Sequence, residues 1–157
     1  MFYFGKIKVH NRKIRFDLDM SRFERQFQKA QFDLDTVVMT DMVPYMPKVT
    51  GTFINTTRAM SAAIAGTGYV YAAAPPMGRF LYEGKTMVSP STGSTYAKKG
   101  EKKVLVSQYK GKTNAQENLV LRRTGDRIDP HWFDIAKQRH GESWVVLAKK
   151  RAGGGNG

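Results

Sequence analysis

Residues 129–151 read DPHWFDIAKQRHGESWVVLAKKR, and this stretch predicts one long amphipathic helix. Asp129 is expected as the N-cap and Pro130 at the first helical position, where a missing N–H costs little. The basic residues at the other end suit the negative end of a helix dipole. The apolar stripe recurs at three- and four-residue steps and consists of Trp132, Phe133, Ala136, His140, Trp144 and Leu147. Both tryptophans of the chain lie in it, and no reactive group is organised on it. The stripe therefore predicts a packing or docking element rather than an active site.

A second helical pattern spans residues 21–43 and is the longest element that the sequence predicts. Ser21 and Glu24 have the spacing of a capping box. The helix should end near Val43, because the residue before Pro44 is biased away from helical geometry. We expect the two long helices to seal one core, formed by Phe23, Phe27, Leu34, Trp132, Phe133 and Trp144.

The remaining elements are short, and several are β-strands. Alternating apolar residues over 2–18 predict a hairpin that turns near residues 10–13. Five further segments are predicted in order: a short helix at 52–63, a strand of small residues at 64–74, a short turn or helix at 77–82 closed by Gly84, and strands at 104–109 and 118–121. The fold class is therefore α+β. A small, mostly antiparallel sheet should pack against the long N-terminal helix and the C-terminal helix, with a long basic hairpin or loop excursion. Residues 1–151 form one domain in this interpretation, and residues 152–157 form a flexible glycine-rich tail.

Composition narrows the function classes. The chain has 157 residues, no cysteine, and 41% apolar residues, so it can bury a core without disulfides or thiolate metal sites. Its N-terminus lacks the apolar region of a secretory signal. Its most apolar window, residues 59–74, is too weakly hydrophobic to span a bilayer. The sequence predicts a soluble protein with no membrane partner.

The positive charge is concentrated in one segment. The chain carries 26 Lys and Arg against 13 Asp and Glu, a net of +13. Residues 85–127 alone hold 10 basic and 3 acidic side chains, and this polar segment is expected to be a long hairpin or a functional loop that orders on a partner. Such an excess indicates contact with DNA, RNA or an acidic protein surface, against the simpler interpretation of a solvated basic hairpin. The candidate contact residues are Lys98, Lys99, Lys102, Lys103, Lys110, Lys112, Arg122 and Arg123.

No convergent catalytic or metal site is predicted. His131 and His140 are nine residues apart, which is not the spacing of a paired zinc site on a helix. His140 is expected as a satisfied, half-buried core histidine, and Asp33 and Asp35 as solvated helix surface. No nucleophile, base and orienting group can be assembled. The sequence therefore predicts a protein that is not an enzyme and holds no cofactor and no metal.

Three collinear segments carry a resemblance to a known family. They are VPYMPKVTG at residues 43–51, the segment from GYVYA to RFLYEG at residues 68–84, and PHWFDIAKQRHGESW at residues 130–144. Together they resemble the small minor capsid or tail-completion proteins of the neck of long-tailed bacteriophages. The insert at 85–127 is longer than the family pattern, and the N-terminal hairpin has no counterpart in it.

The resemblance implies a structural virion protein at the head–tail junction, made in the host bacterial cytoplasm. It implies a homo-oligomeric ring of six or twelve copies around the DNA channel. Its partners would be other neck proteins, on the portal, adaptor and stopper side or on the tail-tube side, and genomic DNA bound without sequence preference. Phe80, Leu81 and Tyr82 are the candidate subunit contacts. The alternative is a stand-alone nucleic-acid-binding protein that uses residues 85–127.

Overall fold

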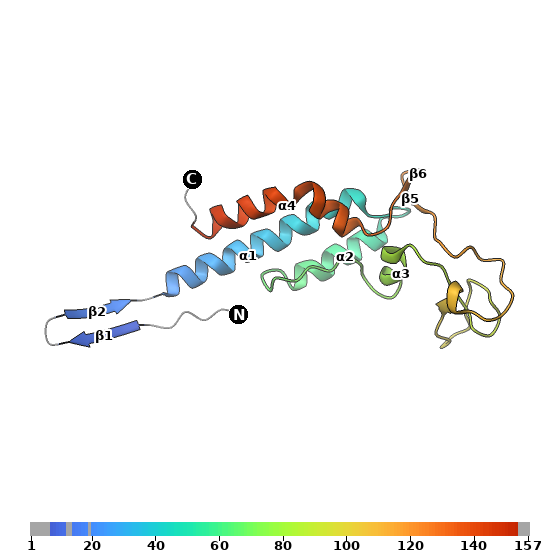
Figure 1. Ribbon diagram of the computed structural model, residues 1–157, viewed down its shortest axis with the longest axis horizontal. Helices are drawn as coiled ribbons and strands as arrows, with labels where there is room; N and C mark the ends of the chain where they lie inside the picture. Colours follow the sequence, from blue (N-terminus) through green and yellow to red (C-terminus); the bar gives the residue numbers. More distant parts are fainter. Residues whose placement is uncertain (1–6, 12–13, 19, 154–157) are drawn as a thin grey trace.

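The computed structural model describes residues 7–11, 14–18 and 20–153 and has the predicted α+β class. Its helices are α1 (Ser21–Met42), α2 (Thr52–Ala63), α3 (Gly78–Glu83) and α4 (Trp132–Arg151), with short 3₁₀ turns η1 (Val43–Tyr45) and η2 (Val106–Gln108). Its strands are β1 (Ile7–Asn11), β2 (Ile14–Leu18), β3 (Met87–Val88), β4 (Val104–Leu105), β5 (Leu121–Arg123) and β6 (Asp126–Ile128). Helices α1, α2 and α4 form an elongated body, with the β1–β2 hairpin beyond the start of α1 and residues 85–120 at the opposite end (Figure 1).

The long helices and the N-terminal hairpin follow the sequence patterns. Helix α1 ends at Met42, before Pro44, and α2 occupies the predicted range. Strands β1 and β2 pair antiparallel, with Val9 opposite Phe16. Phe2, Phe4 and the tip of the predicted turn lie outside the described residues.

The β-structure is divided into three antiparallel ladders of two strands each within the described residues, rather than one sheet. The predicted strand at 64–74 is wrong: this segment is a chain of turns and bends. Side chains of α1 and α2 bind the backbone groups that a sheet would use. The Asp35 carboxylate accepts the N–H groups of Gly66 and Gly68 at 2.8 and 3.1 Å. The Thr57 hydroxyl accepts the Ala74 N–H, and the Ser61 hydroxyl accepts the Tyr71 N–H and donates to the Tyr71 carbonyl.

Asp35 is therefore not solvated helix surface as predicted, because it is 5% exposed and anchors this segment. Its second oxygen accepts a 2.7 Å hydrogen bond from the Gln31 amide. Gly66 and Gly68 have φ of +91° and +84°, values that suit glycine. The loop is anchored by two glycines two positions apart and by a carboxylate on α1. Hydrophobic periodicity does not reveal such an anchor.

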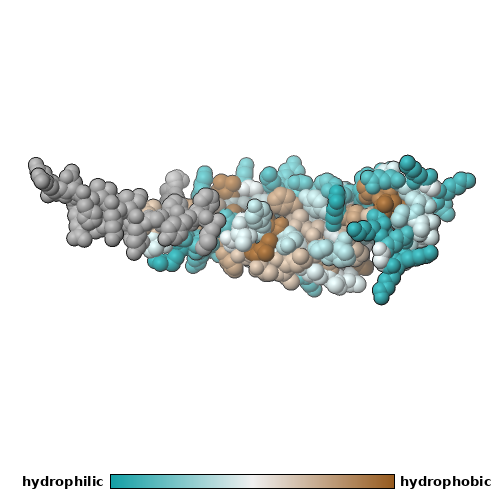
Figure 2. Space-filling view, turned by 90° about the horizontal axis from the view of Figure 1, so that it is seen from below, coloured by the Kyte–Doolittle hydropathy of each residue, from teal (hydrophilic) through white to brown (hydrophobic). Residues whose placement is uncertain are grey.

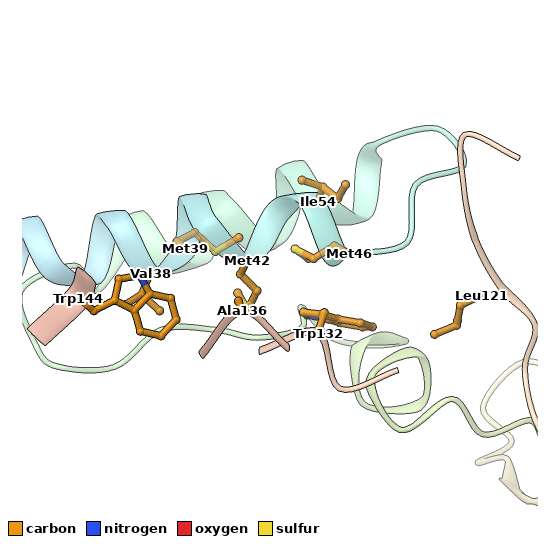
Figure 3. Packing of buried hydrophobic residues seen from close by; sticks show 9 residues of the cluster. All are labelled: Val38, Met39, Met42, Met46, Ile54, Leu121, Trp132, Ala136 and Trp144. Carbon is orange, nitrogen blue, oxygen red and sulfur yellow. The ribbon is translucent and has the colours of Figure 1, made fainter. Parts of the chain in front are cut away.

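The core lies between α1 and α4, and α2 and β5 close one end of it. Figure 3 shows Met42, Ala136 and Trp132 gathered where α1 faces α4, with Ile54 and Leu121 nearby. Trp132 is fully buried and Trp144 is 8% exposed. Leu34 and Phe133 pack against this cluster. The two helices therefore seal one core, as their stripes predict.

Phe23 and Phe27 are corrections to the predicted core, because they are 45% and 44% exposed. Arg151 is the last residue of α4, and its guanidinium Nε lies 3.1 Å from a carboxylate oxygen of Asp33. The first turns of α1 therefore run past the end of α4, which leaves these two rings outside the main cluster (Figure 1).

Helix α4 begins at Trp132, two residues after the predicted start. His131 occupies the N-cap position with φ of +60°, so neither Asp129 nor Pro130 has its predicted role. The His131 N–H donates to the Tyr82 carbonyl at 2.9 Å, and the Trp132 indole N–H donates to the Ala72 carbonyl at 2.7 Å. These tertiary bonds fix where the chain enters the helix and override the local capping signal.

Candidate interaction surface

Residues 85–120, called the basic lobe from here on, are a folded loop rather than a long hairpin. Strands β3 and β4 contribute only two residue pairs, and the rest is held by scattered backbone hydrogen bonds and by side chains. The remainder of the predicted insert returns to the body, where Leu121 is 4% exposed and Arg122 O accepts the Lys48 N–H at 3.0 Å. The lobe and body are therefore continuous, and their junction is fixed.

Glu101 is the internal anchor of the basic lobe. Its carboxylate accepts the hydroxyl of buried Ser89 at 2.9 Å on each oxygen, the N–H of Ser91 at 3.2 Å and the N–H of Lys98 at 3.1 Å. Hydrogen bonding from Ser91, with further bonds from Lys98 and Ser89, lowers the pKa of Glu101 to about 2, against a smaller opposing effect of burial. The acid is thus a structural ion. Its sequence signal is that it stands alone as an acidic residue between positions 85 and 116.

Tyr109 fixes a second part of the lobe against glycine backbone. A Cβ at Gly93 would lie 2.7 Å from the Tyr109 ring, and a Cβ at Gly111 would lie 2.5 Å from its hydroxyl oxygen. The Thr113 hydroxyl donates to the Gly93 carbonyl at 2.7 Å. Only glycine lets the ring approach this closely, so the lobe holds a defined shape.

A cavity of about 730 Å³ opens between α3 and the basic lobe, and we call it the lysine-rimmed hollow. Its apolar lining is Pro76, Met77, Phe80, Leu81, Met87 and Leu119. Its polar lining is Lys85, Thr86, Thr95, Glu101, Lys102 and Lys103. Figure 2 shows apolar atoms set among hydrophilic ones at this end of the molecule.

A second apolar hollow of about 410 Å³ adjoins the first. Both hollows are lined by Pro76, Met77 and Leu81, so these three residues form a shared wall. Met77 is 63% exposed, and Val49 in the second hollow is 91% exposed. Exposed apolar side chains in adjoining concave sites are typical of a surface that binds another macromolecule.

The structure separates the three predicted subunit contacts. Phe80 and Leu81 line the lysine-rimmed hollow, whereas Tyr82 is not among its lining residues. The Tyr82 hydroxyl donates to Asp134 at 3.2 Å, and its ring meets the buried Trp132 ring edge-on at 4.9 Å. Burial, and then the nearby Asp134 charge, raise the pKa of Tyr82 to about 12. Tyr82 thus connects α3 to α4.

The predicted basic contacts also divide. Lys102 and Lys103 line the lysine-rimmed hollow, and Lys103 Nζ donates to the Thr95 carbonyl at 2.6 Å. The other four predicted contact lysines of the lobe are exposed, and none forms an ion pair within the described part of the chain: Lys98, Lys99, Lys110 and Lys112.

Arg122 and Arg123 lie outside the lobe, on β5. Arg122 is exposed and donates to the Gly125 carbonyl. Arg123 is a correction: it is half-buried, and its Nη1 donates to the carbonyls of Val43 and Met46, each at 3.0 Å. It therefore stabilises the chain after α1 and does not belong to the basic surface.

The other titratable groups singled out in the sequence have structural partners. Nε2 of the half-buried His140 lies 3.2 Å from the Tyr45 hydroxyl, as expected of a satisfied core histidine. His131 lies between two carboxylates, 3.5 Å from Glu83 and 3.7 Å from Asp134. Over residues 7–11, 14–18 and 20–153, no three metal-ligating side chains gather in one place.

The hollow includes residues that sequence reasoning missed. Lys85, Met87 and Leu119 reach it because the Leu119 N–H bonds to the Gly84 carbonyl at 2.8 Å, and β3 leads away from the same point. No local motif marks these positions, since the hollow exists only once α3 and the lobe pack together.

Among the described helices, none has the length and apolar character needed to cross a membrane. Comparison of the chain with protein-family models, with curated proteins and with solved structures finds no match.

Proposed function

We propose that this protein is a structural, non-enzymatic component of the head–tail neck of a long-tailed bacteriophage. It assembles as a ring of six or twelve copies around the DNA channel and contacts neighbouring neck proteins. The lysine-rimmed hollow and the second hollow supply the contact surface on one flank, next to the basic lobe.

The observation that carries the proposal is that the three segments resembling neck proteins form one packed unit. The segment at 68–84 bonds to the segment at 130–144 through Ala72 and the Trp132 indole, at 2.7 Å. The segment at 43–51 meets the same helix where the Tyr45 hydroxyl lies 3.2 Å from His140. A resemblance spread over separate surfaces would say little about fold. Here the matching segments contribute Met46, Trp132, Ala136 and Trp144 to the core, and this supports a shared architecture.

The charge of the basic lobe also supports a place beside DNA. A channel protein contacts DNA without reading its sequence, and exposed lysines provide that contact through phosphate charge alone. Lys98, Lys99, Lys110 and Lys112 are exposed, and the lobe that carries them is held rigid by Glu101.

Deletion of the gene from the phage that encodes it tests the proposal. The expected particles are DNA-filled heads and separate tails by electron microscopy, with joined virions restored by the gene supplied in trans. Rings of six or twelve copies are expected for the purified protein or for particles disrupted at the neck. Normal joined virions from the deletion strain would overturn the proposal.

A second function has one observation in its favour. Tyr96 is 85% exposed and lies two residues before Lys98, an arrangement that suits stacking on a base beside a phosphate contact. A stand-alone nucleic-acid-binding protein would bind DNA as a monomer, with log affinity falling steeply against log salt, and would leave joined virions intact when deleted.

A further inference from the structure

We infer that the lysine-rimmed hollow binds an acidic segment with spaced apolar side chains, supplied by a different protein of the neck rather than by a second copy of this chain. The inference rests on the proposed function for where the partner is found. The chemistry of the partner follows from the hollow itself.

The apolar lining of the hollow suits a partner that presents apolar side chains. Phe80, Leu81 and Met87 line it together with Leu119, and Met77 at its edge is 63% exposed. Covering such surface with leucine- or phenylalanine-sized groups removes apolar area from water, which is the main driving force of association. A cavity of about 730 Å³ accommodates several such side chains.

The lysines of the hollow suit a partner that carries negative charge. Lys102 and Lys103 line the hollow, and Lys103 is bound only to the uncharged Thr95 carbonyl within the described residues. The one acid in the lining, Glu101, has both carboxylate oxygens occupied by internal donors. Lys85 is balanced by Glu117 at 3.6 Å. The charge left for a ligand is therefore positive, and carboxylates beside the apolar side chains of the partner complement it.

The exposed apolar side chains on the two long helices do not suit this rim. Phe23 and Phe27 on α1 stand among three basic residues and one acid, Glu24. The acids near exposed Phe32 are already bound, Asp33 by Arg151 at 3.1 Å and buried Asp35 by the N–H groups of residues 66 and 68. Val145 and Val146 on α4 precede the basic run at residues 149–151. Bringing either patch to Lys102 and Lys103 would place like charges together, which opposes binding. This repulsion favours a partner with a different, acidic sequence.

Nucleic acid is also a poor fit to the hollow. Stacking needs an open aromatic face, and the one aromatic ring in the lining, Phe80, is half-buried among aliphatic neighbours. The exposed Tyr96 is not part of the lining. The hollow therefore selects a peptide, and DNA contact belongs to the other lysines of the lobe.

Methyl NMR of the whole chain tests this directly, with methionine methyl groups labelled. The probe is a short synthetic peptide in which leucine and phenylalanine alternate with glutamate. We expect the methyl signals of Met77 and Met87 to shift on titration while those of Met39, Met42 and Met46 in the core stay in place. Replacing every glutamate of the peptide by glutamine should weaken binding about tenfold or more. Replacing its leucines and phenylalanine by serine should abolish binding.

A matched pair of variants separates the site from overall charge. Lys102→Glu with Lys103→Glu reverses the rim, and Lys110→Glu with Lys112→Glu makes the same charge change on residues outside the lining. We expect about a tenfold or larger loss for the first pair and a much smaller one for the second. Equal losses of affinity for the two pairs of variants would overturn the inference. So would a glutamine peptide that binds as tightly as the glutamate peptide, or a glutamate peptide that does not bind. A shift of the Met77 and Met87 signals with an oligonucleotide in place of the peptide would also overturn it. If deletion of the gene separates heads from tails while the peptide fails to bind, the proposed function stands and only the inference falls.

Discussion

The indole N–H of Trp144 donates a 2.7 Å hydrogen bond to a carboxylate oxygen of Asp41, across 103 positions of the chain. This bond ties the middle of α4 to the last turn of α1. Trp144 also stacks on Phe133, with ring centroids 6.2 Å apart. One side chain thus contributes both apolar burial and a charge-assisted bond at the seam of the two longest helices.

Trp144→Phe keeps an aromatic ring at this seam but removes the donor to Asp41. A hydrogen bond to a charged group contributes about 1.5–3 kcal/mol, and the smaller ring also buries less apolar area, so the free energy of unfolding should fall by about 2 kcal/mol or more. Urea denaturation followed by circular dichroism measures it. Val146→Ala is the matched control on the same helix: Val146 is 64% exposed, and its loss should cost less than about 0.5 kcal/mol. Equal stabilities for wild type and Trp144→Phe would show that the bond contributes nothing.

The long elements of this fold could be read from periodicity because their burial is one-sided and local in sequence. Helices α1, α2 and α4 follow apolar stripes closed by proline, glycine or charge. The start of α4 could not be predicted in this way, because the His131 N–H is bound by the carbonyl of Tyr82, which lies on another element. The turns at 64–74 resemble a strand in composition, yet Asp35, Thr57 and Ser61 bind their backbone.

The candidate surface could be predicted only in parts. Phe80 and Leu81 stand out as an apolar turn, and Lys102 and Lys103 as a basic run. That the four residues line one hollow depends on how the lobe folds around Glu101, which is a tertiary property. Arg123 is predicted as a contact residue because it lies in a basic run, but its guanidinium stabilises the fold by binding backbone carbonyls.

Asp35→Asn should lower the free energy of unfolding less than Asp35→Ala. Asp35→Ala leaves the N–H groups of Gly66 and Gly68 without an acceptor and should lower the free energy of unfolding by about 2–4 kcal/mol. Asp35→Asn keeps one oxygen for both N–H groups, and the Gln31 amide can turn so that its oxygen accepts from the new amide. Chemical denaturation ranks the two variants, and hydrogen exchange at Gly66 and Gly68 locates the effect. A loss for Asp35→Asn as large as for Asp35→Ala would contradict this account.

The order of the basic lobe should depend on pH through Glu101. The pKa of Glu101 is about 2 in the folded chain, below its ordinary value of 4.5, so the carboxylate stabilises the fold. This stabilisation is fully present above pH 4.5 and is lost as the pH falls through that value toward about 2. NMR signals of the Ser91 and Lys98 amides, which donate to Glu101, should move as the pH approaches about 2, where the folded carboxylate titrates.

Glu101→Gln should remove that pH response and speed hydrogen exchange in the lobe at neutral pH, because the amide cannot accept every bond that the carboxylate accepts. Glu117→Gln is the matched control in the same lobe: Glu117 pairs with Lys85 at 3.6 Å on the surface. It should leave the Ser91 and Lys98 amides unchanged. If Glu101→Gln retained wild-type protection at both amides, Glu101 would not be the anchor of the lobe.

Arg123 and its neighbour Arg122 offer a comparison between a structural and a surface arginine. Arg123 Nη1 binds two carbonyls of the chain after α1, that of Met46 and that of Val43, which also accepts the Met46 N–H at 3.2 Å. Arg123→Gln removes a charged donor from a half-buried site and should lower the free energy of unfolding by about 1–3 kcal/mol. Arg122→Gln changes the same charge at an exposed position and should cost less than about 0.5 kcal/mol. Thermal and urea unfolding of the two variants measure the difference. A stable Arg123→Gln protein with weakened DNA binding would return Arg123 to the basic surface, whereas a destabilised one with unchanged DNA binding assigns it to the fold.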